Sequence, residues 1–352
     1  MKAAGQYAAA DGSAEVAHPR LRRRPPWWLA VALVPALAIV VVCVRDAASW
    51  VGRPFAGFLF LDSRIVVSIG RSAWRLPSLR RAEWAHITAV DGRPVGSAVD
   101  VHAAARDADV GHEITYGFRR GAEVFRLAIP VRRFGWADFA EIFAPMLGVG
   151  AWLIAIGAAF VVLRPDLPEI RALFAACLML GLALVTGPDQ YGPYRFTWLF
   201  LVSLAAVPTT FLHMTAAFLW KLRPWAGRVV AAMYVAFIGL GAALVVHRDE
   251  PAVFLPLLYL VYFALANALL LYTGSLVSVL VSGQRSRPHV TLALAGILAS
   301  SIIAIGIIVT YPLRTEPVSA PWFILPMAVW PVLSGLAFIR NPDAGVEPGA
   351  PA

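Results

Sequence analysis

The sequence is poor in charged residues and has almost no cysteine. Only 14% of its 352 residues are charged, whereas about 25% is usual in soluble domains. With 59% hydrophobic residues and a mean hydropathy of +0.70, the chain can be neither one soluble globule nor a disordered chain. Its two cysteines, Cys43 and Cys177, lie inside apolar runs, which excludes a disulfide framework and a cysteine metal cluster.

The sequence also lacks the motifs of common catalytic classes. It has no Walker loop, no G-x-G-x-x-G fingerprint and no His-rich tract. Its one His-Glu pair is His112-Glu113, and Tyr116 stands where a zinc protease needs its second histidine. A rhomboid-type pair can be placed only on His213 and Ser275, and a packed structural role is the simpler interpretation of both. We therefore expect no catalytic residues, no metal site and no cofactor.

Long apolar runs dominate the remainder. A bilayer-spanning helix takes roughly 20 residues, and about eight runs approach that length: 27–44, 139–163, 172–187, 198–220, 229–246, 254–281, 291–313 and 322–339. These runs predict a polytopic α-helical membrane protein with about eight transmembrane helices. The first run is long for a signal peptide and Arg45 follows it at once, so an uncleaved anchor is favoured over cleavage near Ser49.

The basic residues indicate the orientation. Arginines cluster at 20–24, and the links richer in Arg and Lys alternate with poorer ones along residues 139–340. The positive-inside rule then places both termini, 1–26 and 341–352, in the cytoplasm. Both termini are expected to be disordered. The high pI of about 10.1 reflects this topology; the basic residues are too dispersed to indicate nucleic acid, and lipid is the expected surrounding.

Residues 45–138 differ from the rest of the chain. They contain 14 arginines and 10 acidic residues, with no spanning run, and predict a small α+β domain outside the membrane, between the anchor 27–44 and a seven-helix bundle at 139–340. The apolar stretch 87–90 leads into an Asp91-Gly92 turn. Ser97 and Asp100 have capping-box spacing for a helix to about Asp107, and residues 113–131 alternate as a hairpin.

This order of strand, turn, short helix and hairpin resembles the second half of a PDZ domain. The resemblance implies a peptide-binding groove in which Gly57 and Phe58 would belong to the carboxylate-binding loop. The other lining residues would be Val67, Ile69, Asp100 and Ala104. A Gly-Asp pair usual in the family is replaced by Trp84-Ala85, so a PDZ-shaped spacer without a ligand is the alternative.

Two polar residues inside apolar runs are further candidates. His213 is either a neutral, packed histidine with one partner or a titrating switch, and Asn267 is expected to join helices of the bundle. Small residues recur at spacing four in 151–159 and in 296–304, which predicts close helix packing. Transport is weakly indicated, because no internal repeat and no carboxylate deep in a span is present.

An anchor helix, an extracytoplasmic PDZ-like domain and seven helices together resemble the membrane input region of bacterial sensor histidine kinases of the competence-pheromone receptor type. The segment 207–214 with the basic turn 221–224 carries the closest local likeness. The kinase and dimerisation domains of that family have no counterpart in these residues. The resemblance implies a receptor of the bacterial inner membrane, and we expect it to sense a peptide or envelope partner and to signal to a separate cytoplasmic kinase or regulator. The alternatives are a membrane scaffold for an envelope enzyme or, less favoured, an intramembrane enzyme; a homodimer is left open.

Overall fold

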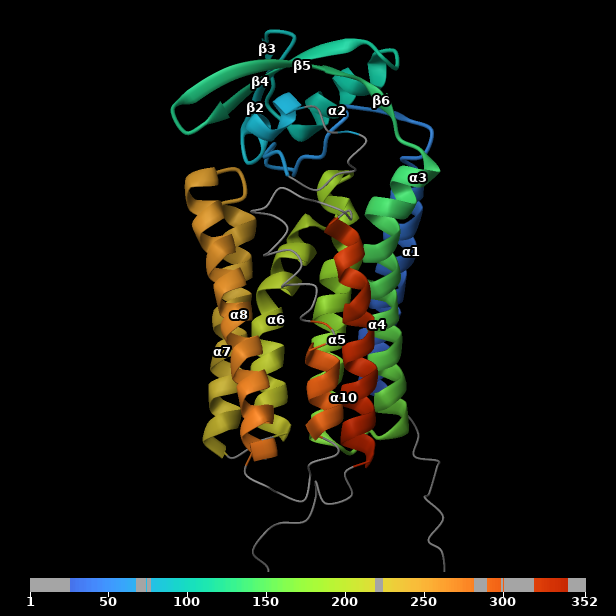
Figure 1. Cartoon of the computed structure of the whole chain (residues 1–352), viewed down its shortest axis with the longest axis vertical. Coiled ribbons are helices and arrows are strands. Elements are labelled where there is room, and N and C mark those ends of the chain that lie inside the picture. Colours follow the sequence, from blue (N-terminus) through green and yellow to red (C-terminus); the bar gives the residue numbers. More distant parts are fainter. Residues whose placement is uncertain are drawn as a thin grey trace, which may run out of the picture.

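The chain forms a helical bundle with a small α+β domain at one end (Figure 1). This computed structural model describes residues 26–67, 74, 77–218, 224–281, 290–298, 300 and 320–340. The long helices are α1 (Trp27–Ala48), α4 (Ala144–Leu163), α5 (Pro168–Thr186), α6 (Thr197–Phe218), α7 (Pro224–Val246), α8 (Pro251–Val281) and α10 (Val329–Arg340). Shorter helical segments are α3 (Trp136–Asp138), η3 (Phe139–Phe143), η4 (Pro188–Tyr191) and η5 (Ala320–Ala328).

Six helical stretches are long and apolar enough to cross a membrane: Trp27–Ala48, Trp136–Leu163, Pro168–Tyr191, Thr197–Phe218, Trp225–Val246 and Pro251–Val281. They coincide with the first six predicted runs and indicate a membrane-embedded protein. The prediction of eight spans is not confirmed. Of the run 291–313, only 291–298 and 300 are described, and they are helical. The apolar helical segment Ile324–Ile339 is shorter than the other six.

The domain is built on a four-stranded antiparallel sheet with the order β3-β2-β4-β5. Its strands are β2 (His86–Val90), β3 (Arg93–Pro94), β4 (Glu113–Arg120) and β5 (Glu123–Pro130). The helix α2 (Ala98–Asp107) connects β3 to β4. A second, two-stranded sheet pairs β1 (Pro54–Phe55) with β6 (Arg132–Arg133), next to the bundle, and a short helix η2 (Pro77–Ala82) precedes β2.

The predicted order of strand, turn, helix and hairpin is confirmed, since local chemistry determines it. Asp91 and Gly92 both adopt positive φ, +47° and +79°, as a tight hairpin turn requires. The backbone N–H of Asp100 donates to Ser97 Oγ, and the Asp100 carboxylate accepts from the Ser97 N–H at 2.9 Å. This reciprocal pair satisfies two donors that the first turn of α2 would otherwise leave free.

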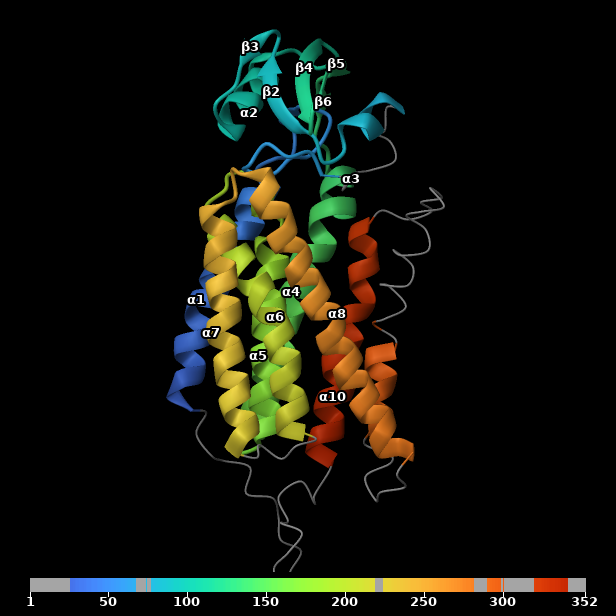
Figure 2. The same ribbon diagram turned by 90° about the vertical axis from the view of Figure 1, so that its left-hand side faces the viewer.

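The domain lies at one end of the bundle, and the start of α1 and the end of α10 lie at the other (Figures 1 and 2). We call the end that carries the domain the domain end and the other the far end. The helix α1 runs towards the domain, and α10 runs away from it, so Trp27 and Arg340 both lie at the far end. The α4–α5 link with Arg164 is also at the far end. The links containing Arg195 and Arg248 are at the domain end.

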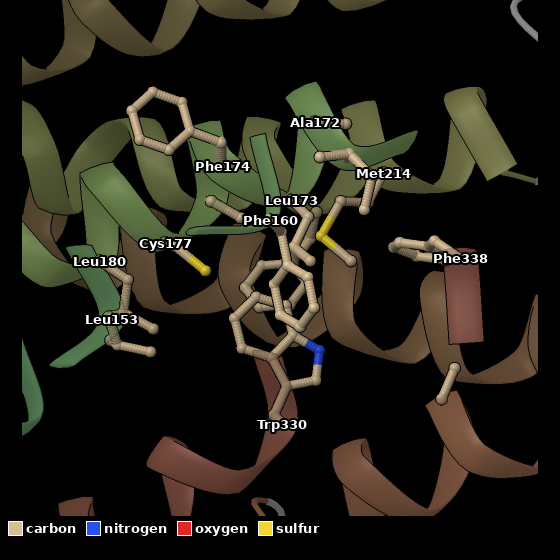
Figure 3. Packing of buried hydrophobic residues seen from close by; sticks show 14 of the residues in the cluster. Leu153, Phe160, Ala172, Leu173, Phe174, Cys177, Leu180, Met214, Trp330 and Phe338 are labelled. Carbon is tan, nitrogen blue, oxygen red and sulfur yellow. The ribbon is translucent and has the colours of Figure 1, made fainter. Parts of the chain in front are cut away.

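The main core of the bundle lies where α4, α5, α6 and α10 meet. Figure 3 shows Phe160 of α4, Leu173 of α5 and Met214 of α6 gathered near Trp330 of α10. The Phe160 ring occupies the space above Gly335, where any β-carbon would overlap it. Glycine at position 335 therefore lets α10 approach α4 closely enough to bury this ring.

Glycines, rather than the predicted alanine stripe, let α4 and α5 approach each other closely. A β-carbon at Gly150 of α4 would lie 2.7 Å from the carbonyl oxygen of Gly181 in α5, and one at Gly157 would lie 2.8 Å from Cys177 Cβ. Ala155 and Ala159 are exposed on another face of α4. The sequence pattern identified the right kind of residue on this helix but the wrong face, because spacing alone does not say which stripe meets a neighbour.

Two hydrophobic clusters join the domain to the bundle. Ile65, which forms an isolated β-bridge with His86 of the domain, is fully buried among residues of α6, α7 and α8 that include Leu201 and Phe254. In the second cluster, Phe134 stacks on Phe143 with ring centroids 5.1 Å apart. Asp62 also pairs with Arg248, at 2.9 Å, across the same junction. The domain is therefore packed against the bundle and not merely tethered to it.

The glycine contact between α4 and α5 leads to a stability prediction. We expect Gly150→Ala to lower the free energy of unfolding by about 1–3 kcal/mol, because the added methyl group has no space against the α5 backbone. Gly148→Ala is the matched control, since nothing lies within 4 Å of a β-carbon at that position of the same helix. Thermal unfolding of both variants in detergent measures the difference, and equal midpoints would contradict the packing.

Candidate functional site

The structure places the residues of the predicted groove in different surroundings. Phe58 is buried in the domain core, edge-on to Tyr116 at 5.1 Å, and a β-carbon at Gly57 would lie 3.0 Å from the Pro130 carbonyl oxygen. Val67 packs against the cluster that joins domain and bundle. Ala104 packs against the domain core. Ile69 lies outside the described residues.

Asp100 has a structural task at the start of α2. Its carboxylate accepts hydrogen bonds from the backbone N–H groups of Ser97 and Gly96, at 2.9 and 3.1 Å. A hydrogen bond with the Ser97 side chain, followed by the bonds from the backbone N–H groups of Ser97 and Gly96, lowers the pKa of Asp100 below its ordinary value. Because its oxygens already satisfy the helix start, Asp100 shapes the helix that carries the site described below.

The two intramembrane candidates each have one recorded partner. His213 Nδ1 lies 3.3 Å from the Tyr234 hydroxyl of α7, so α6 and α7 are joined by this contact. Ser275, the other half of the rhomboid-type pair, belongs to α8. The Asn267 side chain donates to the carbonyl of Phe263 on its own helix, at 2.7 Å, and is exposed. This geometry gives Asn267 a bond within α8.

A cavity of about 450 Å³ opens where the domain meets the bundle. Its walls come from the end of α1 and the segment after it, from one face of α2, and from the loop between η4 and α6. The lining residues are Asp46, Ser49, Trp50, Arg53, Pro54, Phe55, Val99, His102, Arg106, Gly192, Pro193, Tyr194 and Arg195. We call this space the junction cavity. It is the candidate site because the domain and the bundle both contribute to it.

His102 is the central polar side chain of the junction cavity. Its Nε2 lies 2.8 Å from the Tyr194 hydroxyl. Its ring stacks on the Phe60 ring, with the centroids 4.5 Å apart, and packs edge-to-face with the Trp50 ring, with the centroids 5.6 Å apart. Burial lowers the pKa of His102 from 6.5 to about 4, although a hydrogen bond to the Tyr191 carbonyl opposes the shift. Burial also raises the pKa of Tyr194. Both side chains are therefore neutral at pH 7.

The loop of the junction cavity is held by a buried carboxylate. Asp189 accepts hydrogen bonds from the backbone N–H groups of Arg195 and Phe196, at 3.2 and 2.6 Å. Gly192 has φ of +129° and Tyr194 has φ of +68°, which the Asp189 contacts and the His102 bond stabilise together. Such strained positions persist only where the surroundings fix them, so Tyr194 is held in place before any ligand arrives.

Charge in the junction cavity is mainly positive. Asp46 pairs with Arg195 at 3.2 Å and with Arg45 at 3.5 Å. Arg53 and Arg106 line the cavity and are exposed. Three lining arginines against one lining aspartate leave a net charge of +2. The site can therefore attract and hold an anion.

Ser49 of the junction cavity is not arranged as an activated nucleophile. Ser49 donates its hydroxyl hydrogen bond to the Asp46 carbonyl at 2.7 Å, and the Asp46 carboxylate is paired with arginines. A nucleophile needs an adjacent base that is free to accept its proton, and this arrangement does not provide one for Ser49. Among the described residues, no group of three or more His, Cys, Asp or Glu side chains could hold a metal ion.

Sequence reasoning did not identify the junction cavity. Val99, His102 and Arg106 follow helical spacing on one face of α2, which is a usable local signal. The pairing of His102 with Tyr194, however, joins positions 92 residues apart. No local pattern reports such a contact.

The His102 environment leads to a pH prediction. The unfolded chain binds a proton near pH 6.5 and the folded chain only near pH 4, so stability falls on acidification through that window, by up to about 3 kcal/mol. His86, whose pKa burial also lowers to about 4, acts in the same direction. We expect His102→Gln to flatten, but not abolish, this loss in unfolding experiments between pH 4 and pH 7. The exposed His112→Gln is the control, and a His102→Gln profile as steep as that of the native chain would contradict the assignment.

Comparisons of the chain with protein-family models, with curated proteins and with solved structures gave no match. The geometry of the junction cavity is therefore the basis for any functional conclusion.

Proposed function

We propose that this chain is a receptor module of a bacterial inner membrane. In this proposal, the PDZ-like domain faces the extracytoplasmic side, a ligand binds in the junction cavity, and a separate cytoplasmic protein reads the resulting change at the far end. The predicted groove of the isolated domain is replaced as ligand site by the junction cavity, because the groove residues Gly57 and Phe58 are packed against other parts of the domain.

The observation that carries this proposal is the shared wall of the junction cavity. Three lining residues, Val99, His102 and Arg106, belong to the domain. Asp46 belongs to α1, and Arg195 lies two residues before α6. A ligand that contacts all of these binds one relative position of domain and bundle better than others. Differential affinity of this kind shifts the population of conformations, which is the physical requirement for a receptor.

The distribution of charge supports the proposed orientation. Arg164 and Arg171 lie at the far end, where the described termini also lie, and the Arg20–Arg24 cluster precedes α1. The positive-inside rule assigns this end to the cytoplasm. The resemblance to the input region of sensor histidine kinases is the reason to expect a kinase or regulator as the reader.

A scaffold function is the second candidate, and one observation favours it. The strand β5 is an edge of the four-stranded sheet, and Val124 on it is 70% exposed. An uncovered edge strand can pair with an extended segment of another protein. In this case the domain would hold an envelope protein through β5, and the junction cavity would play no part.

Two variants separate these functions. Val99→Trp fills the junction cavity from α2, and Val124→Lys places a charge beside the free edge of β5; both positions are exposed, so both variants are expected to fold. Crosslinked partners are recovered from membranes of the native host. A receptor predicts that Val99→Trp changes recovery of a cytoplasmic partner several-fold while Val124→Lys has no effect.

The scaffold predicts the opposite pattern, in which Val124→Lys loses an envelope protein and Val99→Trp behaves like the native chain. Deletion of the whole domain is a poorer test, because it would also remove Ile65 and Phe134 from the clusters shared with the bundle. A change after deletion would then report a damaged bundle.

A further inference from the structure

The junction cavity lies at the level of the lipid headgroups. The helix α1 has 22 residues, and at 1.5 Å per residue it is about 33 Å long, close to the roughly 30 Å of a hydrocarbon core. Residues just after Ala48 therefore emerge among the headgroups at the domain end. Trp198, at the start of α6, is 52% exposed, and Trp136, at the start of α3, is 67% exposed. Such exposed tryptophans are typical of the membrane interface.

Arginines line the cavity at this level. Arg53 follows α1, Arg106 projects from α2, and Arg195 precedes α6. Guanidinium groups suit phosphate oxygens, because several N–H donors can meet one oxyanion. Asp46 forms ion pairs with Arg195, which lines the cavity, and with Arg45, which does not. It therefore orients Arg195, and the net charge of the lining stays positive.

The other surfaces of the cavity are apolar. Trp50, Pro54, Phe55, Val99 and Pro193 line it beside the arginines. A small hydrated anion gains little from such walls, whereas the glycerol and first methylene groups of a lipid gain from contact with them. Position, charge and apolar walls together favour an anion that the membrane itself supplies.

We propose that the junction cavity binds the phosphate headgroup of an anionic membrane lipid, with Arg53 and Arg106 as the principal phosphate contacts. The inference deepens the receptor proposal, on which its signalling meaning rests, by naming the chemical class of the ligand. The neutral pair of His102 and Tyr194 would support Trp50 and the loop 192–195 behind the headgroup.

The test uses the full chain in nanodiscs. Phosphatidylcholine discs are compared with discs containing increasing fractions of phosphatidylglycerol, and with phosphatidylcholine discs to which inorganic phosphate is added. Thermal unfolding is measured in each, because a ligand of the folded state raises the midpoint. We expect phosphatidylglycerol to raise the midpoint and inorganic phosphate to have no comparable effect.

The double variant Arg53→Gln/Arg106→Gln tests the site. The phosphatidylglycerol fraction that gives half of the stabilisation should rise about tenfold or more, because two charge-assisted hydrogen-bonding groups are lost. The matched control is Arg93→Gln/Arg126→Gln, two exposed arginines of β3 and β5 away from the cavity. This control should behave like the native chain and excludes a general effect of charge.

Three results would overturn the inference: an equal response of the double variant and the native chain, no response to phosphatidylglycerol at all, or full stabilisation by inorganic phosphate alone. The last would identify a soluble anion as the ligand. The receptor proposal fails separately, if Val99→Trp leaves partner recovery unchanged. Lipid binding that depends on Arg53 and Arg106 without any change of partner would identify a structural lipid site.

Discussion

The burial of Ile65 between α6, α7 and α8 ties the domain to the bundle, and the arrangement of the candidate site depends on it. A fully buried isoleucine contributes about 1.5–3 kcal/mol over an exposed one, and the stacked rings of Phe134 and Phe143 add to the attachment on the other side. Two separate anchors fix orientation as well as position. The face of α2 that carries His102 is thereby held above the end of α1, and the space between them becomes a cavity with defined walls.

The junction cavity combines a neutral polar pair with charged residues that lie nearer the solvent. His102 and Tyr194 satisfy each other in a partly buried place where an unpaired polar group would be costly. Arg53 and Arg106, in contrast, remain exposed and keep their charge available to a ligand. This separation matters, because a charged group at the position of His102 would cost stability, while arginines near the solvent attract anions at little cost.

Sequence reasoning succeeded where the determinant was local. Hydropathy identified the six long apolar helices because each span needs its own continuous apolar run, and Ser97 with Asp100 identified the start of α2 through a four-residue pattern. It failed where a contact joins two segments that lie far apart in the chain. Gly150 meets Gly181, and His102 meets Tyr194, only after the helices have packed. The predicted groove used residues that the folded domain needs for its own core and for its contact with the bundle.

The helix α6 is the element best placed to carry a change from the junction cavity to the far end. Tyr194 and Arg195 lie three and two residues before its first residue, Leu201 on its first turns packs with Ile65, and the helix contacts α5, α7 and α8. Pro208 removes one backbone hydrogen bond from the middle of α6, so the two halves can bend relative to each other more easily than in an uninterrupted helix. The half beyond Pro208 carries Met214 into the main core beside Trp330. Under the receptor proposal, a shift of the loop 192–195 would act on α6 first and would reach the packing at the far end through the half beyond Pro208, without requiring the domain to detach.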